Sequence, residues 1–148
     1  MIYLDTSVLL VYTLTHSAEI ARSRAVDALF TRINSGVISA STSFYALHEL
    51  YVFALENVAA AETGYGFGKA ALETILRTPV RILPFSPRAE RRRLSRRFAA
   101  LRDASDIPHA VSAYLADCEA IVAYDDHFRT IAHIIPYKTP EDFQQSAT

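Results

Sequence analysis

The first ten residues place a carboxylate at the end of a short apolar stretch. Met1–Leu4 are apolar or aromatic, Asp5 follows them directly, and another apolar run begins at Val8. This pattern predicts a buried strand that ends at Asp5. Because ligands in open α/β sheets bind outside the carboxyl ends of strands, Asp5, with Thr6 and Ser7 beside it, is a candidate site residue. The alternative is that Asp5 or Thr6 only caps a following helix.

The same arrangement recurs near the other end of the chain. Residues 120–123 are apolar and predict a second short buried strand, which is followed by Asp125 and Asp126. Upstream, a helix is predicted to begin shortly before Asp106, and the helix dipole favours a negative charge in that first turn. Standing alone, Asp103 and Asp106 would be interpreted as capping acids. With acids at two strand ends in the same chain, they become candidates for one acidic site.

Glu49 lies within a predicted helix that starts near residues 41–43 and is apolar on nearly every side. Such a helix is buried or forms a subunit interface, and its tyrosines and phenylalanines predict a homodimer surface. An ionised carboxylate in this setting is costly unless it is paired, hydrogen-bonded or bound to a metal ion. The alternatives are that Glu49 reaches solvent at the helix edge, or pairs with His48 or an arginine.

The remaining sequence alternates between helical and strand-like patterns. Helices are predicted over residues 8–14, 18–33, 69–77 and 86–101, and strands over 37–41, 80–83 and part of 131–137. Gly36 is a natural left-handed end for the second of these helices. Residues 139–143 predict a capped turn.

Residues 59–68 contain three of the four glycines in the chain and predict a flexible connection. Gly64, Gly66 and Gly68 precede Lys69, but this spacing matches neither the dinucleotide fingerprint nor the phosphate-binding loop. The glycines therefore give no indication of a nucleotide site.

Residues 88–97 carry the strongest charge feature, six arginines and no lysine. Arg88, Arg92 and Arg96 follow at four-residue steps and share one face of an amphipathic helix. The simplest interpretation is a solvated surface. The alternative is a rim that contacts phosphates or an acidic partner, because arginine makes bidentate contacts to phosphate and carboxylate.

Composition narrows the class of protein. With 148 residues, 51% of them hydrophobic and 21% charged, the chain is predicted to form one globular domain. A net charge of −1 argues against general coating of polyanions, so any nucleic-acid contact must come from a local patch. Its one cysteine excludes an internal disulfide and a thiolate zinc cluster, and fits the reducing cytoplasm. No leader pattern or apolar run of about 20 residues is present, so we expect a cytoplasmic location and no membrane partner.

Taken in order, these motifs resemble the PIN domain family, and within it the VapC-type ribonuclease toxins of VapBC toxin–antitoxin pairs. Five features carry the resemblance, which extends over essentially the whole chain: strand–Asp5–Thr6–Ser7, Glu49 in HEL, Asp106 before an alanine-rich helix, IVAYDDHF, and a terminal TPEDF. Each motif alone is a carboxylate beside apolar residues, whereas the ordered set is considerably more specific.

The resemblance implies a three-layer α/β/α fold with a mostly parallel sheet, in one domain over residues 1–148. It implies a metal-dependent endoribonuclease that cleaves RNA phosphodiester bonds by metal-activated water, with an inhibitory VapB-like antitoxin as partner. Carried over by position, the four catalytic acids are Asp5, Glu49, Asp106 and Asp125, and the hydroxyl of Ser7 helps to hold the metal site. Because the aspartate is doubled, Asp126 competes with Asp125 for the fourth position, and Asp103 is the fallback for the third.

The physics of such a site is consistent with that expectation. Two carboxylates about 5 Å apart repel by roughly 3 kcal/mol at an effective dielectric constant of about 20, so four together would take up protons or bind a divalent cation. Oxygen ligands favour Mg²⁺ or Mn²⁺ over zinc. His109 and His127 are supporting or RNA-facing candidates, although a lone histidine is more often structural. Two other functions stay open: a housekeeping PIN nuclease for RNA maturation, and a degenerate PIN module that binds without cutting.

Overall fold

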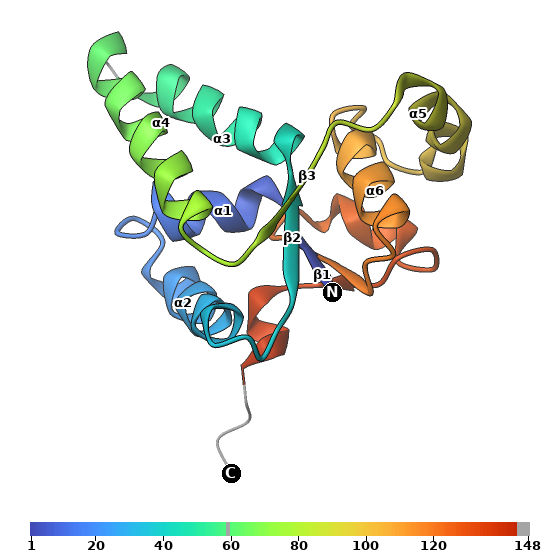
Figure 1. The fold of residues 1–148 in the computed structure, drawn as a ribbon, viewed down its shortest axis with the longest axis horizontal. Coiled ribbons are helices and arrows are strands. Elements are labelled where there is room, and N and C mark those ends of the chain that lie inside the picture. Colours follow the sequence, from blue (N-terminus) through green and yellow to red (C-terminus); the bar gives the residue numbers. More distant parts are fainter. Residues whose placement is uncertain (59, 145–148) are drawn as a thin grey trace.

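The computed structural model describes residues 1–58 and 60–144, and its centre is a five-stranded sheet (Figure 1). The strands lie in the order β3-β2-β1-β4-β5, and every neighbouring pair is parallel. Their bounds are Ile2–Leu4 for β1, Ala40–Ser43 for β2, Arg81–Leu83 for β3, Ala120–Val122 for β4 and Tyr137–Lys138 for β5.

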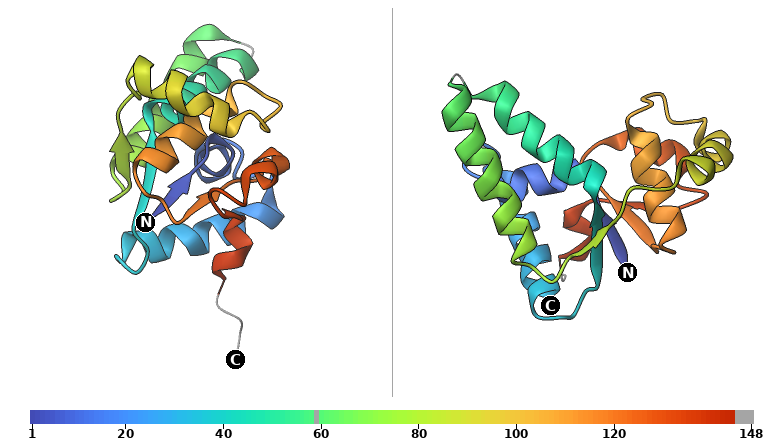
Figure 2. Two further views of the ribbon diagram at one scale, coloured as in Figure 1. Left: turned by 90° about the vertical axis from the view of Figure 1, so that its right-hand side faces the viewer. Right: turned by 45° about the horizontal axis from the view of Figure 1, so that its top comes forward.

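Helices cover both faces of this sheet (Figures 1 and 2). One layer contains α1 (Thr6–Thr13), α2 (Ile20–Asn34), α3 (Phe44–Asn57) and α4 (Ala61–Leu76), and the other contains α5 (Arg88–Ser95), the 3₁₀ turn η1 (Arg96–Phe98) and α6 (Asp106–Leu115). Two further 3₁₀ segments, η2 (Asp126–Ile131) and η3 (Pro140–Phe143), complete the chain. None of the helices in the described part of the chain combines the length and apolar character needed to cross a membrane.

Alternation along the strands divides the core in two. Ile2 and Leu4 of β1 pack with the layer of α1 to α4, whereas Tyr3 points to the opposite face and packs with α6 and η1. The residues paired with them in β4 alternate in the same way, since successive side chains of a strand face opposite sides. The predicted three-layer α/β/α fold with a parallel sheet is therefore confirmed.

The strand order reverses between β1 and β4, because β2 and β3 extend the sheet from β1 while β5 extends it from β4. A crevice forms at the carboxyl ends of the strands at such a switch point. The backbone nitrogen of Asp5 donates to the carbonyl of Val122 at 3.0 Å, which keeps the two strand ends together. Asp5 and Asp125 leave the sheet at this position, from β1 and β4.

The flexible connection predicted over residues 59–68 is wrong, apart from residue 59, which lies outside the described residues. Ala61–Leu76 form the single helix α4, which packs along α3. A Cβ at Gly64 would lie 2.9 Å from the carbonyl oxygen of Ala54, and one at Gly68 would lie 2.7 Å from the ring of Tyr51. These two glycines, one helical turn apart, therefore allow the close approach of two helices.

Smaller deviations concern the ends of elements. The second strand begins at Ala40 instead of residue 37, and the predicted strand over part of 131–137 is reduced to Tyr137–Lys138. Gly36 has a φ of +77°, as expected for a left-handed helix end. Thr139 and Asp142 form the predicted capped turn, because each side chain bonds the backbone of the other.

Candidate active site

Asp5 is held rigidly at the end of β1. Its side chain is buried, and its Oδ2 accepts hydrogen bonds from the backbone nitrogen of Ser7 at 3.0 Å and from Ser7 Oγ at 2.6 Å. Ser7 Oγ in turn accepts a bond from the backbone nitrogen of Tyr124 at 2.9 Å, which joins the segments after β1 and β4. The capping role considered from the sequence is real, but it uses only Oδ2. Oδ1 has no hydrogen bond among the described residues.

Glu49 points from α3 toward the same strand end. Its Oε2 accepts a hydrogen bond from Thr6 Oγ1 and lies 3.1 Å from Nε2 of His109. Burial would raise the pKa of Glu49, but the contacts with His109 and Thr6 outweigh it and hold that pKa below its usual value. Its main partner is therefore neither His48 nor an arginine. Oε1 of Glu49 has no hydrogen bond within the described ranges.

His109 of α6 is the polar centre of this arrangement, although no sequence pattern distinguished it from a structural histidine. The ring is 1% exposed, and its Nδ1 lies 2.8 Å from the hydroxyl of Tyr3 and 3.8 Å from Oδ1 of Asp5. Burial lowers the pKa of His109, but the contact with Glu49 and the negative charge of Asp5 raise it overall. His109 thus connects the acids of β1 and α3.

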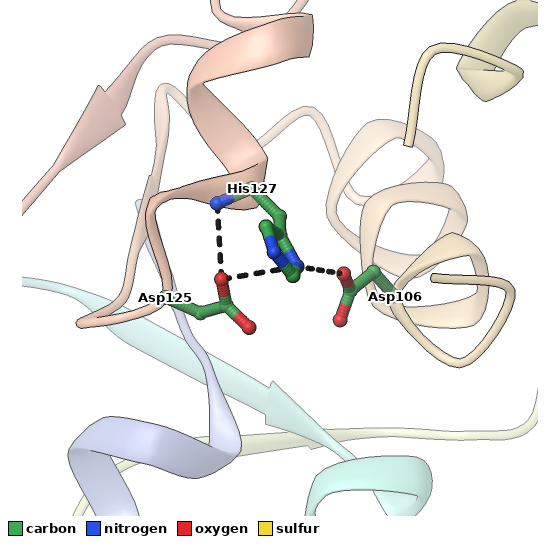
Figure 3. A group of neighbouring side chains, drawn as sticks. All are labelled: Asp106, Asp125 and His127. Carbon is green, nitrogen blue, oxygen red and sulfur yellow. Dashed lines mark hydrogen bonds and ion pairs between the residues drawn. The ribbon is translucent and has the colours of Figure 1, made fainter. Parts of the chain in front are cut away.

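Asp106, Asp125 and His127 form a second group (Figure 3). One potential ligand atom of each lies within 4.8 Å of the others. Nδ1 of His127 is 3.3 Å from Oδ1 of Asp125 and 3.6 Å from Oδ2 of Asp106. Asp125 also caps η2 by accepting a bond from the backbone nitrogen of His127 at 3.0 Å.

The charge of Asp5 in the first group acts on Asp106 in the second. Burial, followed by the charges of Asp125 and Asp5, raises the pKa of Asp106 to about 6. Its Oδ2 is buried and accepts no hydrogen bond from any described residue, although Nδ1 of His127 lies 3.6 Å away. A buried oxygen without a donor is rare in folded proteins and requires an explanation such as an ion.

The donor set fits a hard divalent cation. Asp5, Glu49 and Asp106 each present a carboxylate oxygen that accepts no hydrogen bond in the described structure. Carboxylate oxygens are the ligands that Mg²⁺ and Mn²⁺ prefer.

The competing candidates lie outside the group. The side chain of Asp126 is exposed and follows Asp125 into η2, and Asp103 is exposed and accepts a bond from the backbone of Ser105. Arg88, Arg92 and Arg96 are exposed, as the amphipathic pattern predicted. The single helix predicted over residues 86–101 is wrong, because α5 ends at Ser95 and the 3₁₀ turn η1 begins at Arg96.

The arginine helix packs near the first turn of α6, the helix that carries Asp106. Arg91 and Arg92 line a hollow together with Ile107 and Pro108, the two residues that follow Asp106. Arg91 also donates to the hydroxyl of Tyr45 in α3 at 3.1 Å. The hollow between α5 and the start of α6 therefore has arginines on one wall.

The sequence model of the PIN domain matches residues 2–134, which include all four predicted acids. The chain belongs to the PIN domain family. Membership of this family supports a nuclease, and PIN nucleases generally use a divalent metal ion.

Solved structures share the fold of this PIN domain. VapC20 of Mycobacterium tuberculosis, a toxin that cleaves the sarcin-ricin loop, superposes with a TM-score of 0.66 at 15% identity, over 88% of this chain and 95% of that one. VapBC2 from Rickettsia felis, bound to a DNA fragment from its promoter, has a TM-score of 0.62 at 17% identity, over 94% of this chain and 98% of that one. FitAcB from Neisseria gonorrhoeae has a TM-score of 0.65 at 19% identity, over 95% of this chain and 98% of that one. No curated protein sequence matches the chain.

Proposed function

We propose that this PIN domain is a metal-dependent endoribonuclease and the toxin of a type II toxin–antitoxin pair. The observation that carries the proposal is the buried Oδ2 of Asp106, which accepts no hydrogen bond among the described residues and lies in a group of acids at the sheet's switch point. An isolated capping acid would have a hydrogen-bond donor. This one is surrounded by further negative charge, which raises its pKa.

Asp5, Asp106 and Asp125 would hold Mg²⁺ or Mn²⁺, with Glu49 at the edge of the site. When bound, the cation lowers the pKa of a water molecule and neutralises charge on the phosphate. We leave out Asp126, because its side chain is exposed beyond the group.

The protein's own groups provide position and proton handling. The low pKa of Glu49 keeps its carboxylate ionised, so its free Oε1 is suited to accept a hydrogen bond from the attacking water. Ser7 and Tyr124 prevent Asp5 from rotating. Arg91 and Arg92, which share a hollow with Ile107 and Pro108 of α6, are suited to bind phosphates of the RNA, with Arg88 and Arg96 extending the same positive surface.

An antitoxin of the VapB class is the proposed inhibitory partner. Support comes from the fold shared with VapC20 and VapBC2 and from the sequence motifs. A small reading frame directly upstream of the gene would favour the toxin, whereas its absence would favour a housekeeping nuclease. As for other proteins of this proposed role, we place the chain in the cytoplasm.

A homodimer is the proposed assembly. Phe44 of α3 and Phe85 after β3 are 46% and 58% exposed, and their rings stack at 5.5 Å. Two exposed phenylalanines in contact are typical of an interface. Light scattering should show a dimer for the wild type and a monomer for the Phe44→Ser, Phe85→Ser variant; a monomeric wild type would contradict the proposal.

The direct experiment incubates the purified protein with tRNA, rRNA and mRNA in the presence of Mg²⁺, Mn²⁺ or EDTA and maps the new ends. We expect discrete internal cuts with either metal ion and intact RNA in EDTA. Equal cutting in EDTA, or no cutting of any RNA, would contradict the proposal.

A further inference from the structure

A continuous chain of polar contacts crosses the core from one face of the sheet to the candidate site. Ser43, the capping residue of α3, lies 2.7 Å from the hydroxyl of Tyr3, and this hydroxyl lies 2.8 Å from Nδ1 of His109. On the other side of the ring, Nε2 lies 3.1 Å from Oε2 of Glu49. Ser43, Tyr3 and His109 are all nearly inaccessible to solvent.

Nε2 of His109 carries a proton toward Glu49 whether the imidazole ring is neutral or charged. In the neutral ring the Tyr3 hydroxyl donates to Nδ1, so the proton is on Nε2 and Nε2 donates to Glu49. In the charged ring Nδ1 donates to Tyr3, whose own proton turns to Ser43, and Nε2 still donates to Glu49. The Tyr3 hydroxyl can serve both states because it has a partner on each side.

Glu49 needs such a fixed donor. Its side chain is 38% exposed and has several freely rotating bonds, so nothing in its own packing sets the direction of the carboxylate. Oε2 accepts a hydrogen bond from Thr6 and forms an ion pair with Nε2 of His109. Two partners from different helices, α1 and α6, therefore hold Oε2 and limit the rotation of the carboxylate.

We propose that His109 is a positioning residue that acts through Glu49: by holding Oε2 it fixes a carboxylate that offers its other oxygen, Oε1, to the cation. This inference rests on the proposed metal-dependent function, because it assumes that a divalent cation binds there. It assigns His109 no direct contact with substrate or metal ion.

Titration with Mn²⁺ tests the proposal without RNA. We expect His109→Leu to raise the Kd of Mn²⁺ about 10- to 100-fold, the usual effect of losing a group that orients a ligand. His109→Gln should bring the Kd back toward the wild-type value, because its amide nitrogen reaches the place of Nε2. His109→Asn, whose shorter amide reaches only the place of Nδ1, should not. His133→Leu, at an exposed histidine, is the matched control and should bind like the wild type.

A double-mutant cycle separates positioning from general damage to the fold. In a Glu49→Ala background, His109→Leu should change the Kd of Mn²⁺ by no more than about twofold, because the group it positions is gone. Thermal unfolding of each variant identifies any that fail to fold. If His109→Leu fails to fold, the comparison of His109→Gln with His109→Asn tests the same proposal.

The proposal is overturned if His109→Leu binds Mn²⁺ as the wild type does, if Gln and Asn behave alike, or if the loss is as large without Glu49 as with it. A wild type that binds Mn²⁺ but cuts no RNA would overturn only the nuclease function, and the comparison of Kd values would still decide the role of His109. A wild type with no saturable Mn²⁺ binding would overturn both.

Discussion

Ser7 Oγ lies 2.9 Å from the backbone nitrogen of Tyr124, a residue 117 positions later, and at the same time donates to Asp5 at 2.6 Å. One hydroxyl thus joins the ends of the two strands at which the order of the sheet reverses. The candidate site is built across this join, with Asp5 on one side and Asp125 on the other.

Replacing Ser7 by alanine should remove both bonds and leave the N–H of Tyr124 without a partner. We expect the free energy of unfolding to fall by about 1–3 kcal/mol, the usual cost of an unsatisfied buried donor. Urea denaturation in EDTA measures this change. Ser17→Ala, at an exposed serine, is the control and should stay within about 0.5 kcal/mol of the wild type.

The raised pKa of Asp106 predicts how stability depends on pH in the absence of metal ions. Between about pH 4 and pH 6 the folded chain keeps a proton on Asp106 that the unfolded chain has released. The contribution of this group to the free energy of unfolding therefore decreases as the pH rises through that window. As the pH rises from about 4 to about 6, we expect the free energy of unfolding of Asp106→Asn to increase relative to that of the wild type. Urea denaturation in EDTA measures both. A constant difference between the two proteins would show that Asp106 titrates normally.

The glycines of α4 allow a sharp comparison. Gly64→Ala should destabilise the fold by about 1–3 kcal/mol, because its Cβ would meet the backbone oxygen of Ala54 at 2.9 Å. Gly66→Ala has no atom within 4 Å and should stabilise by about 0.5–1 kcal/mol through its better helix propensity. Opposite signs in thermal or urea unfolding are expected. Equal effects would mean that α3 and α4 do not pack as described.

The arginines beside the site should set the salt dependence of RNA binding. Replacing Arg92 and Arg96 by glutamine should weaken binding of single-stranded RNA and reduce the slope of log K against log salt by about 0.7 for each phosphate that the arginines neutralise. Arg77→Gln, at the exposed end of α4, is the matched control. Fluorescence anisotropy in EDTA measures binding without cleavage, and an unchanged slope would return Arg92 and Arg96 to a solvated surface.

Sequence patterns were most informative where chemistry and periodicity agree. Apolar stretches that end in Asp5 and Asp125 indicated the two central strands, and the helix start at Asp106 was evident from its acid and the proline in its first turn. Glu49 was recognised because a carboxylate conflicts with an apolar helix. The family resemblance supplied the parallel three-layer arrangement, which no local pattern specifies.

What the sequence could not provide is long-range geometry. His109 is 104 residues from Asp5 in sequence, and only the packing of α6 against β1 brings its ring to Asp5 and Glu49. The glycines of α4 predicted a flexible segment because the sequence shows their conformational freedom. It does not show that α3 packs closely against them. The sequence alone does not distinguish Asp125 from Asp126. In the structure Asp125 caps η2, whereas Asp126 is its first residue and is exposed to solvent.

The most direct test of the metal-dependent nuclease compares wild type and Asp5→Asn in cleavage of RNA with Mg²⁺ or Mn²⁺. The asparagine keeps the size of the side chain and an oxygen for Ser7 but loses the negative charge. We predict a loss of cleavage of at least about 100-fold with little change in thermal unfolding, and no cleavage by either protein in excess EDTA. Equal cleavage by the variant, or full cleavage by the wild type in EDTA, would contradict the account.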